Sequence, residues 1–71
     1  MVITLTSPGI LTTERMKKGF SIRSLAKNAG LNSATVWKVE RGAVNPNPAT
    51  ARALCSALEV EFDSIFTIKE A

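Results

Sequence analysis

Hydrogen-bonding and basic side chains recur at helical spacing between residues 33 and 41, and they are the groups in this chain best suited to chemistry. Ser33, Lys38 and Arg41 fall on the outward side of an expected helix. A serine hydroxyl both donates and accepts hydrogen bonds, whereas lysine and arginine only donate and carry positive charge. Groups of this kind indicate noncovalent recognition of a polar or anionic partner.

Covalent chemistry is difficult to build from this sequence. It contains no histidine, no tyrosine and a single cysteine, Cys55. A glycine-rich phosphate loop and a carboxylate pair beside a nucleophile are also missing from it. We therefore expect a protein that is not an enzyme and that uses no metal and no cofactor.

Two short amphipathic helices are expected to carry these recognition groups. Apolar residues recur at helical spacing in both, and each helix begins at a capping residue, Ser21 or Asn32. Gly30 allows a tight reversal between them, and the second helix ends before Gly42. The form, over about residues 21–41, is that of a helix-turn-helix, in which one helix braces the other for insertion into a DNA major groove.

The flanking segments predict three more helices and two short strands. The first helix should run from about residue 8 or 10 to residue 18, with Ser7 as its cap and Ile10, Leu11 and Met16 facing inward. Residues 45–48 form a turn that excludes helix, and helices at about 49–58 and 62–66 follow. Residues 2–6 and 66–69 alternate as strands do. These strands are expected to pair within one chain or across a dimer, the alternative being frayed termini.

The size and charge of the chain limit the number of domains it can form and the kind of partner it can bind. Seventy-one residues with 45% hydrophobic composition form one small domain, residues 1–71. Its net charge of +3 is uneven, because residues 1–41 hold seven basic and two acidic groups and the remainder holds two basic and four acidic groups. A polyanionic partner for the first half would explain this, although a solvated charged surface has the same signature.

Cysteine usage and hydropathy indicate the compartment. A lone Cys55 cannot form an internal disulfide, and we expect it to be a small core or surface residue rather than a redox sensor. The first residues lack the features of a signal peptide, and no run approaches the ~18 apolar residues of a membrane span. A cytoplasmic protein is expected.

Residues 11–66 resemble the Cro/CI repressor type of helix-turn-helix, known as the Xre family. The resemblance rests on the order and spacing of these groups: Leu11, Arg15, Gly19-Phe20-Ser21, Leu25-Ala26, Gly30, Thr35-Val36, Val39-Glu40-Arg41-Gly42, Asn45-Pro46, Ala57-Leu58 and Phe62-Asp63-Ser64-Ile65-Phe66. It implies an all-α, five-helix lambda-repressor-like domain, to which the short terminal β-strands would be added. It also implies binding of operator DNA as a homodimer.

The resemblance further implies which residues meet the DNA. The base-reading positions would be Ser33, Ala34 and Lys38, with Thr35 beside them. A lysine can reach the acceptors of guanine, and alanine or a threonine methyl can touch a thymine methyl. The positions expected at the sugar-phosphate backbone are Ser21, Ile22, Arg23, Trp37, Arg41, Asn45 and Asn47.

Two positions stand apart from this pattern. Family members often have glutamine where this chain has Ile22, which weakens the expected phosphate contact, and Arg23 is the compensating group. Trp37 has three open roles: packing on the DNA backbone, contacting a partner protein, or folding back over the core. The resemblance also implies an ion pair between Arg15 and Glu40 that is structural.

These observations lead to two functional hypotheses. The first is a sequence-specific transcriptional regulator, a small Cro-like repressor in a phage or mobile-element switch that inserts residues 33–41 into the major groove. The alternative is a protein-binding modulator, antirepressor or antitoxin that complexes a larger repressor or a toxin. Short side chains at Ser33 and Ala34 and the aromatic Trp37 favour the alternative.

Overall fold

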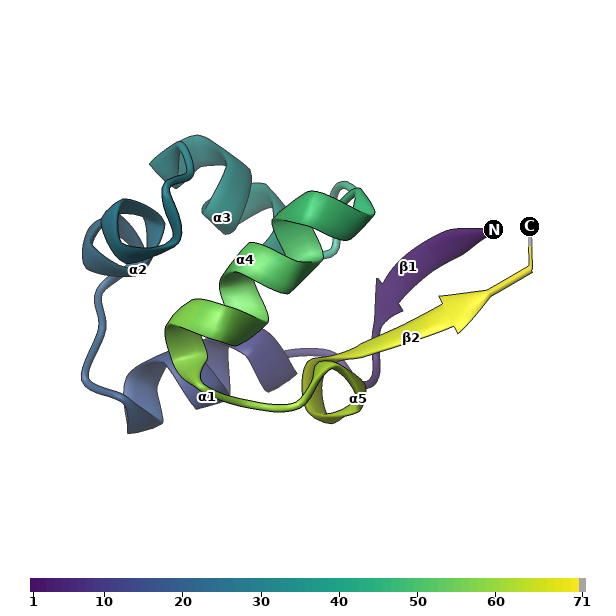
Figure 1. Cartoon of the computed structure of the whole chain (residues 1–71), viewed down its shortest axis with the longest axis horizontal. Helices are drawn as coiled ribbons and strands as arrows, with labels where there is room; N and C mark the ends of the chain where they lie inside the picture. The colour runs from purple at the N-terminus through teal and green to yellow at the C-terminus, as the bar shows by residue number, and fades with distance from the viewer. Residues whose placement is uncertain (71) are drawn as a thin grey trace.

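The computed structural model describes residues 1–70 and contains five helices and two strands. In chain order these are β1 (Val2–Leu5), α1 (Ile10–Lys17), α2 (Ile22–Ala29), α3 (Ser33–Glu40), α4 (Pro48–Leu58), α5 (Phe62–Ile65) and β2 (Phe66–Lys69). The helices form one body, and the strands extend from it at one end of the longest axis (Figure 1). The predicted fold class, five helices with short terminal strands, is confirmed.

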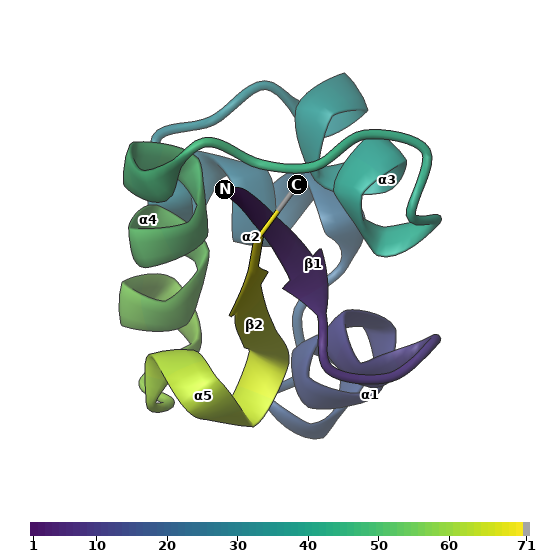
Figure 2. The same ribbon diagram turned by 90° about the vertical axis from the view of Figure 1, so that its right-hand side faces the viewer.

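The two strands pair with each other inside one chain. They are antiparallel, with Ile3 opposite Ile68 and Leu5 opposite Phe66. Because directly opposite residues share a face, these four apolar side chains lie on the same side of the sheet. Ile3 and Phe66 are buried against the helices, whereas Ile68 near the outer end is 57% exposed. Seen along the long axis, the strands lie between α4 and α5 on one side and α1 and α3 on the other (Figure 2).

A single hydrophobic core joins the helices and the inner end of the sheet. Its fully buried large side chains come from every helix and from β2: Leu11, Leu25, Val36, Val39, Leu54, Leu58, Ile65 and Phe66. Burying each of these contributes about 1.5–3 kcal/mol relative to exposure. Cys55 belongs to the same core, as expected for a small apolar residue on α4.

Side-chain caps fix where the central helices begin. The Ser21 hydroxyl accepts from the Ser24 amide at 3.0 Å, and the Ser24 hydroxyl accepts from the Ser21 amide at 2.8 Å. This is a capping box built from two serines, where the second position is usually Glu or Gln. Asn32 Oδ1 accepts from the Ala34 amide at 2.8 Å and caps α3. Both predicted caps are confirmed.

Three local expectations are wrong. Ser7 does not cap α1 with its side chain; a turn intervenes in which the Ser7 carbonyl accepts from the Ile10 amide, and Gly9 is the residue that precedes the helix. Met16 is 66% exposed, because five residues after buried Leu11 is about 140° around the helix.

The third error concerns residues 45–48, which do not exclude helix throughout. Pro48 is the first residue of α4, a position where proline loses no helical hydrogen bond. The Asn47 side chain caps this helix by accepting from the Thr50 amide at 2.8 Å.

Candidate nucleic-acid interface

The turn between α2 and α3 sets the angle at which α3 is presented. Gly30 adopts a left-handed conformation with φ of 70°, and the Leu31 amide donates back to the Ala26 carbonyl at 2.8 Å. Glycine has no Cβ penalty in this region, so the reversal occurs without strain. Leu31 then packs against the core, and Asn32 starts α3 two residues after the glycine. The result is a compact helix-turn-helix with α2 beside α3 (Figure 1).

One side of α3 is anchored in the core and the other is free of the rest of the chain. Val36, Val39 and Glu40 are buried. The outer face of α3, as we define it, consists of the exposed residues Ser33, Ala34, Trp37, Lys38 and Arg41. Three of the four predicted base-reading residues, Ser33, Ala34 and Lys38, therefore share one surface. Thr35 is half-buried and lies to the side of it.

The start of α2 offers fewer side-chain donors than expected. The Ser21 hydroxyl is used by the capping box, and Ile22 is half-buried against the core. Arg23 is exposed, and the first amides of a helix have no intrahelical acceptor. An anion at this point would meet backbone amides and the Arg23 guanidinium rather than a serine or a glutamine side chain.

The residues predicted to contact the DNA backbone near the end of α3 differ in how free their side chains are to do so. Asn45 is exposed, whereas the Asn47 side-chain oxygen is committed to the cap of α4. Arg41 lies with its guanidinium carbon 4.4 Å from the centre of the Trp37 ring, in cation–π geometry. The four-residue spacing of the two side chains allows this stacking but does not predict it.

Charge pairing leaves the helix-turn-helix half strongly basic. Both acids of residues 1–41 are paired, Glu40 with Arg15 at 2.8 Å and Glu14 with Lys17 at 3.3 Å. Over residues 1–70, the other five basic side chains of this half make no ion pair: Lys18, Arg23, Lys27, Lys38 and Arg41. Four of the five belong to α2, α3 or the end of α3, so the unneutralised positive charge is concentrated on the helix-turn-helix.

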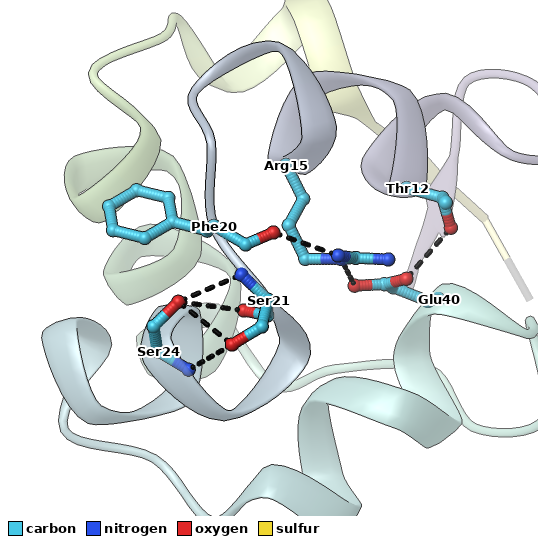
Figure 3. A network of polar contacts seen from close by, with 6 residues as sticks. All are labelled: Thr12, Arg15, Phe20, Ser21, Ser24 and Glu40. Carbon is cyan, nitrogen blue, oxygen red and sulfur yellow. Dashed lines mark hydrogen bonds and ion pairs between the residues drawn. The ribbon is translucent and has the colours of Figure 1, made fainter.

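A buried polar network ties α3 to the first helix. Glu40 accepts from Arg15 Nε and from the Thr12 hydroxyl, each at 2.8 Å, and Arg15 Nη1 donates to the Phe20 carbonyl at 2.9 Å (Figure 3). The two charged side chains are 14% and 6% exposed. The ion pair implied by the resemblance is present, and Thr12 and Phe20 are members that sequence reasoning missed. Thr12 precedes Arg15 by three residues, a spacing that places both on one face of α1.

Other kinds of site receive no support from the part of the chain that the structure describes. Within residues 1–70, no three His, Cys, Asp or Glu side chains are grouped to hold a metal ion. Burial raises the pKa of the Cys55 thiol, with the nearby Arg52 guanidinium opposing the shift, so this thiol stays protonated and unreactive near neutral pH. None of the described helices has the length and apolar character needed to cross a membrane.

Comparison with known proteins agrees with this geometry. A family model described as a helix-turn-helix domain matches residues 10–63. The HTH-type transcriptional regulator SlrR of Bacillus subtilis is 34% identical over 58 residues, which are 80% of this chain and 38% of SlrR. The chain thus spans well under half the length of that relative.

Solved structures give the same result. The restriction-modification controller protein C.AhdI from Aeromonas hydrophila is 33% identical with a TM-score of 0.76, over 80% of this chain and 86% of that one. An HTH_3 family transcriptional regulator from Vibrio cholerae is 31% identical with a TM-score of 0.72, over 78% of this chain and 31% of that one. These relatives are regulators and not enzymes. The chain belongs to the helix-turn-helix family, among the Cro/CI-type transcriptional regulators.

Proposed function

We propose that this protein regulates transcription by binding a specific site in duplex DNA, with α3 in the major groove. The observation that carries the proposal is the outer face of α3, which is exposed along its length and flanked by basic side chains that have no carboxylate partner within residues 1–70. Ser33, Ala34 and Lys38 read base edges, with Thr35 at the margin. Arg23, Arg41 and Asn45, the Ile22 amide at the start of α2, and the Asn47 segment hold the sugar-phosphate backbone.

Selection from random duplexes at physiological salt tests this proposal. Enrichment of a palindromic site with half-sites about 10 base pairs apart is the expected result, since a two-fold dimer presents two copies of α3 one helical turn apart. Absence of any enriched motif, from protein shown by circular dichroism to be helical, would overturn it. In this proposal, the protein and the DNA that it binds are both located in the cytoplasm.

Salt dependence gives a second test of the same interface. Two protomers that each place Arg23 and Arg41 on phosphates would give a slope of about −3.6 in log K against log salt, at about 0.9 per neutralised phosphate. Replacing both arginines with alanine should flatten the slope by most of that amount. An affinity that does not change between low and high salt would contradict phosphate contact.

We propose that the active form is a homodimer that meets at the strand end of the molecule. An apolar cleft of about 490 Å³ lies there, lined by Met1, Ile3, Pro46, Pro48 and Ile68 among others. The Cα atoms extend over 32 × 20 × 18 Å, and the strands lie at one end of the longest dimension (Figure 1). A contact through this cleft would leave the outer face of α3 uncovered in both copies, because none of the residues of that face lines the cleft.

Ile68→Glu is the variant that tests this surface. Ile68 is 57% exposed and on the apolar side of the sheet, so a charge there should leave the monomer folded and dissociate the dimer. Sedimentation equilibrium should show a monomer for Ile68→Glu and a dimer for Lys69→Glu, which alters the opposite side of the sheet. Retention of the dimer by Ile68→Glu would exclude this surface.

The manner of regulation is also a proposal. A small domain bound to an operator acts by occupancy, because it excludes polymerase or another regulator from the same DNA. Its likeness to a restriction-modification controller protein supports a Cro-like repressor in a phage or mobile-element switch. Placing the recovered site against promoter sequences would test this, and a site outside any promoter would contradict it.

A protein-binding role remains the second candidate, because Trp37 is 46% exposed on a face whose other side chains include short Ser33 and Ala34. In this alternative, the partner is a larger repressor or a toxin, and Trp37 is its anchor. Trp37→Ala would then dissolve the complex without changing DNA affinity. The same variant should weaken DNA binding if the first proposal holds.

A further inference from the structure

Trp37 and Arg41 form a cation–π pair at the end of α3, and the two side chains have different roles in it. The guanidinium carbon of Arg41 lies 4.4 Å from the centre of the Trp37 ring. Both side chains are exposed, so this contact is not a consequence of core packing. An attraction between the cation and the ring face is what holds the two together.

The backbone beneath Arg41 is fixed independently. The Arg41 amide donates to the Trp37 carbonyl at 3.1 Å, and the Ala43 amide donates to the Lys38 carbonyl at 2.9 Å. Gly42 adopts φ of 73°, which completes a left-handed helix end. With its main chain fixed, the remaining freedom of Arg41 lies in its long side chain, and the Trp37 ring restricts that freedom.

Stacking leaves the guanidinium able to bind a further anion. The guanidinium presents five N–H donors in its plane, more than a contact with one ring can cover. In residues 1–70 Arg41 makes no ion pair, and the neighbouring Glu40 is buried with Arg15 and Thr12 as its partners. The planar donors of Arg41 therefore remain available to two oxygens of one phosphate.

We infer that Trp37 is a positioning residue, which holds the Arg41 guanidinium in place for a backbone phosphate at the end of the recognition helix. The inference rests on the proposed DNA-binding function and replaces a direct contact by Trp37 with an indirect one. Because the ring orders the arginine before binding, less side-chain entropy is lost when the phosphate contact forms.

A double-mutant cycle on the selected duplex tests the inference. Trp37→Leu should weaken binding about two- to tenfold per protomer, the range expected when one long side chain must be ordered on binding. Trp37→Phe, which keeps a ring face, should recover part of that loss. In an Arg41→Ala background Trp37→Leu should have no further effect. Met16→Leu, at an exposed apolar residue on α1, is the matched control and should bind as the wild type does.

The outcomes separate this inference from the proposal on which it depends. An equal loss from Trp37→Leu with and without Arg41 would show that Trp37 touches the DNA itself, and would overturn the inference alone. Unchanged binding by Trp37→Leu would overturn it as well. A wild-type protein that binds no duplex overturns both proposals. Thermal unfolding is the control for folding: loss of an exposed cation–π contact should lower the midpoint by no more than about 8 °C in a domain of this size. A larger decrease would assign Trp37 a structural role and overturn the inference.

Discussion

Replacing Arg15 with leucine is expected to lower the free energy of unfolding by about 3–5 kcal/mol, because the change leaves the buried Glu40 carboxylate without its cation. Both side chains of the pair are largely buried, and Glu40 keeps only the Thr12 hydroxyl as a donor. The loss is large for a domain of this size, whose total stability is on the order of 4–10 kcal/mol. Urea unfolding followed by circular dichroism measures it.

The Glu14–Lys17 pair provides a matched control on the same helix. Its Lys17 side chain is 67% exposed and the two atoms are 3.3 Å apart, so Lys17→Ala should cost less than about 1 kcal/mol. The double variant Arg15→Leu with Glu40→Leu should recover much of the lost stability, since apolar replacement of a whole buried pair is often neutral. Equal, small effects of Arg15→Leu and Lys17→Ala would show that the Arg15–Glu40 pair is not structural.

Lys38→Ala is expected to reduce affinity for the selected site about 5- to 150-fold relative to a scrambled duplex, if its ammonium makes the guanine contact that its place on α3 allows. Ser33→Ala should have a smaller effect in the same direction. The reason is that base contacts determine sequence preference, whereas phosphate contacts weaken binding to every sequence alike. Fluorescence anisotropy with the selected and scrambled duplexes measures both affinities.

Lys27→Ala is the control for the loss of one positive charge. Lys27 is an exposed cation on α2 that lies outside the outer face of α3. Its replacement should weaken binding to the two duplexes equally and slightly. An equal effect of Lys38→Ala on both duplexes would assign Lys38 to the backbone and leave base reading to other residues.

The recognition helix illustrates how much of the site was accessible from sequence. Apolar residues Val36 and Val39 identify the buried side, so the exposure of Ser33, Ala34 and Lys38 follows from helical periodicity alone. The same holds for the caps at Ser21 and Asn32, because a cap acts within two or three residues of the chain. The Arg15–Glu40 pair, in contrast, was expected only from the family resemblance.

Some errors arose where a local signal had two meanings. The two prolines in residues 45–48 predict a turn without helix, yet proline is equally suited to the first turn of a helix, and the Asn47 cap selects the helix at Pro48. Met16 is apolar but lies on the far side of α1 from Leu11. Which side of a short helix is buried depends on the elements that pack against it, and the residues of the helix alone do not identify those elements.

Local sequence signals were sufficient to predict the starts of α2 and α3, the turn at Gly30 and the concentration of positive charge in the first half of the chain, because each depends on neighbours close along the chain. Three features emerged only from the folded structure: the terminal strands pair within one chain, Thr12 and Phe20 complete the Glu40 network, and Arg41 stacks on Trp37. The strand pairing and the Glu40 network join segments separated along the sequence. The stacking depends on side-chain rotamers, which helical spacing permits without fixing.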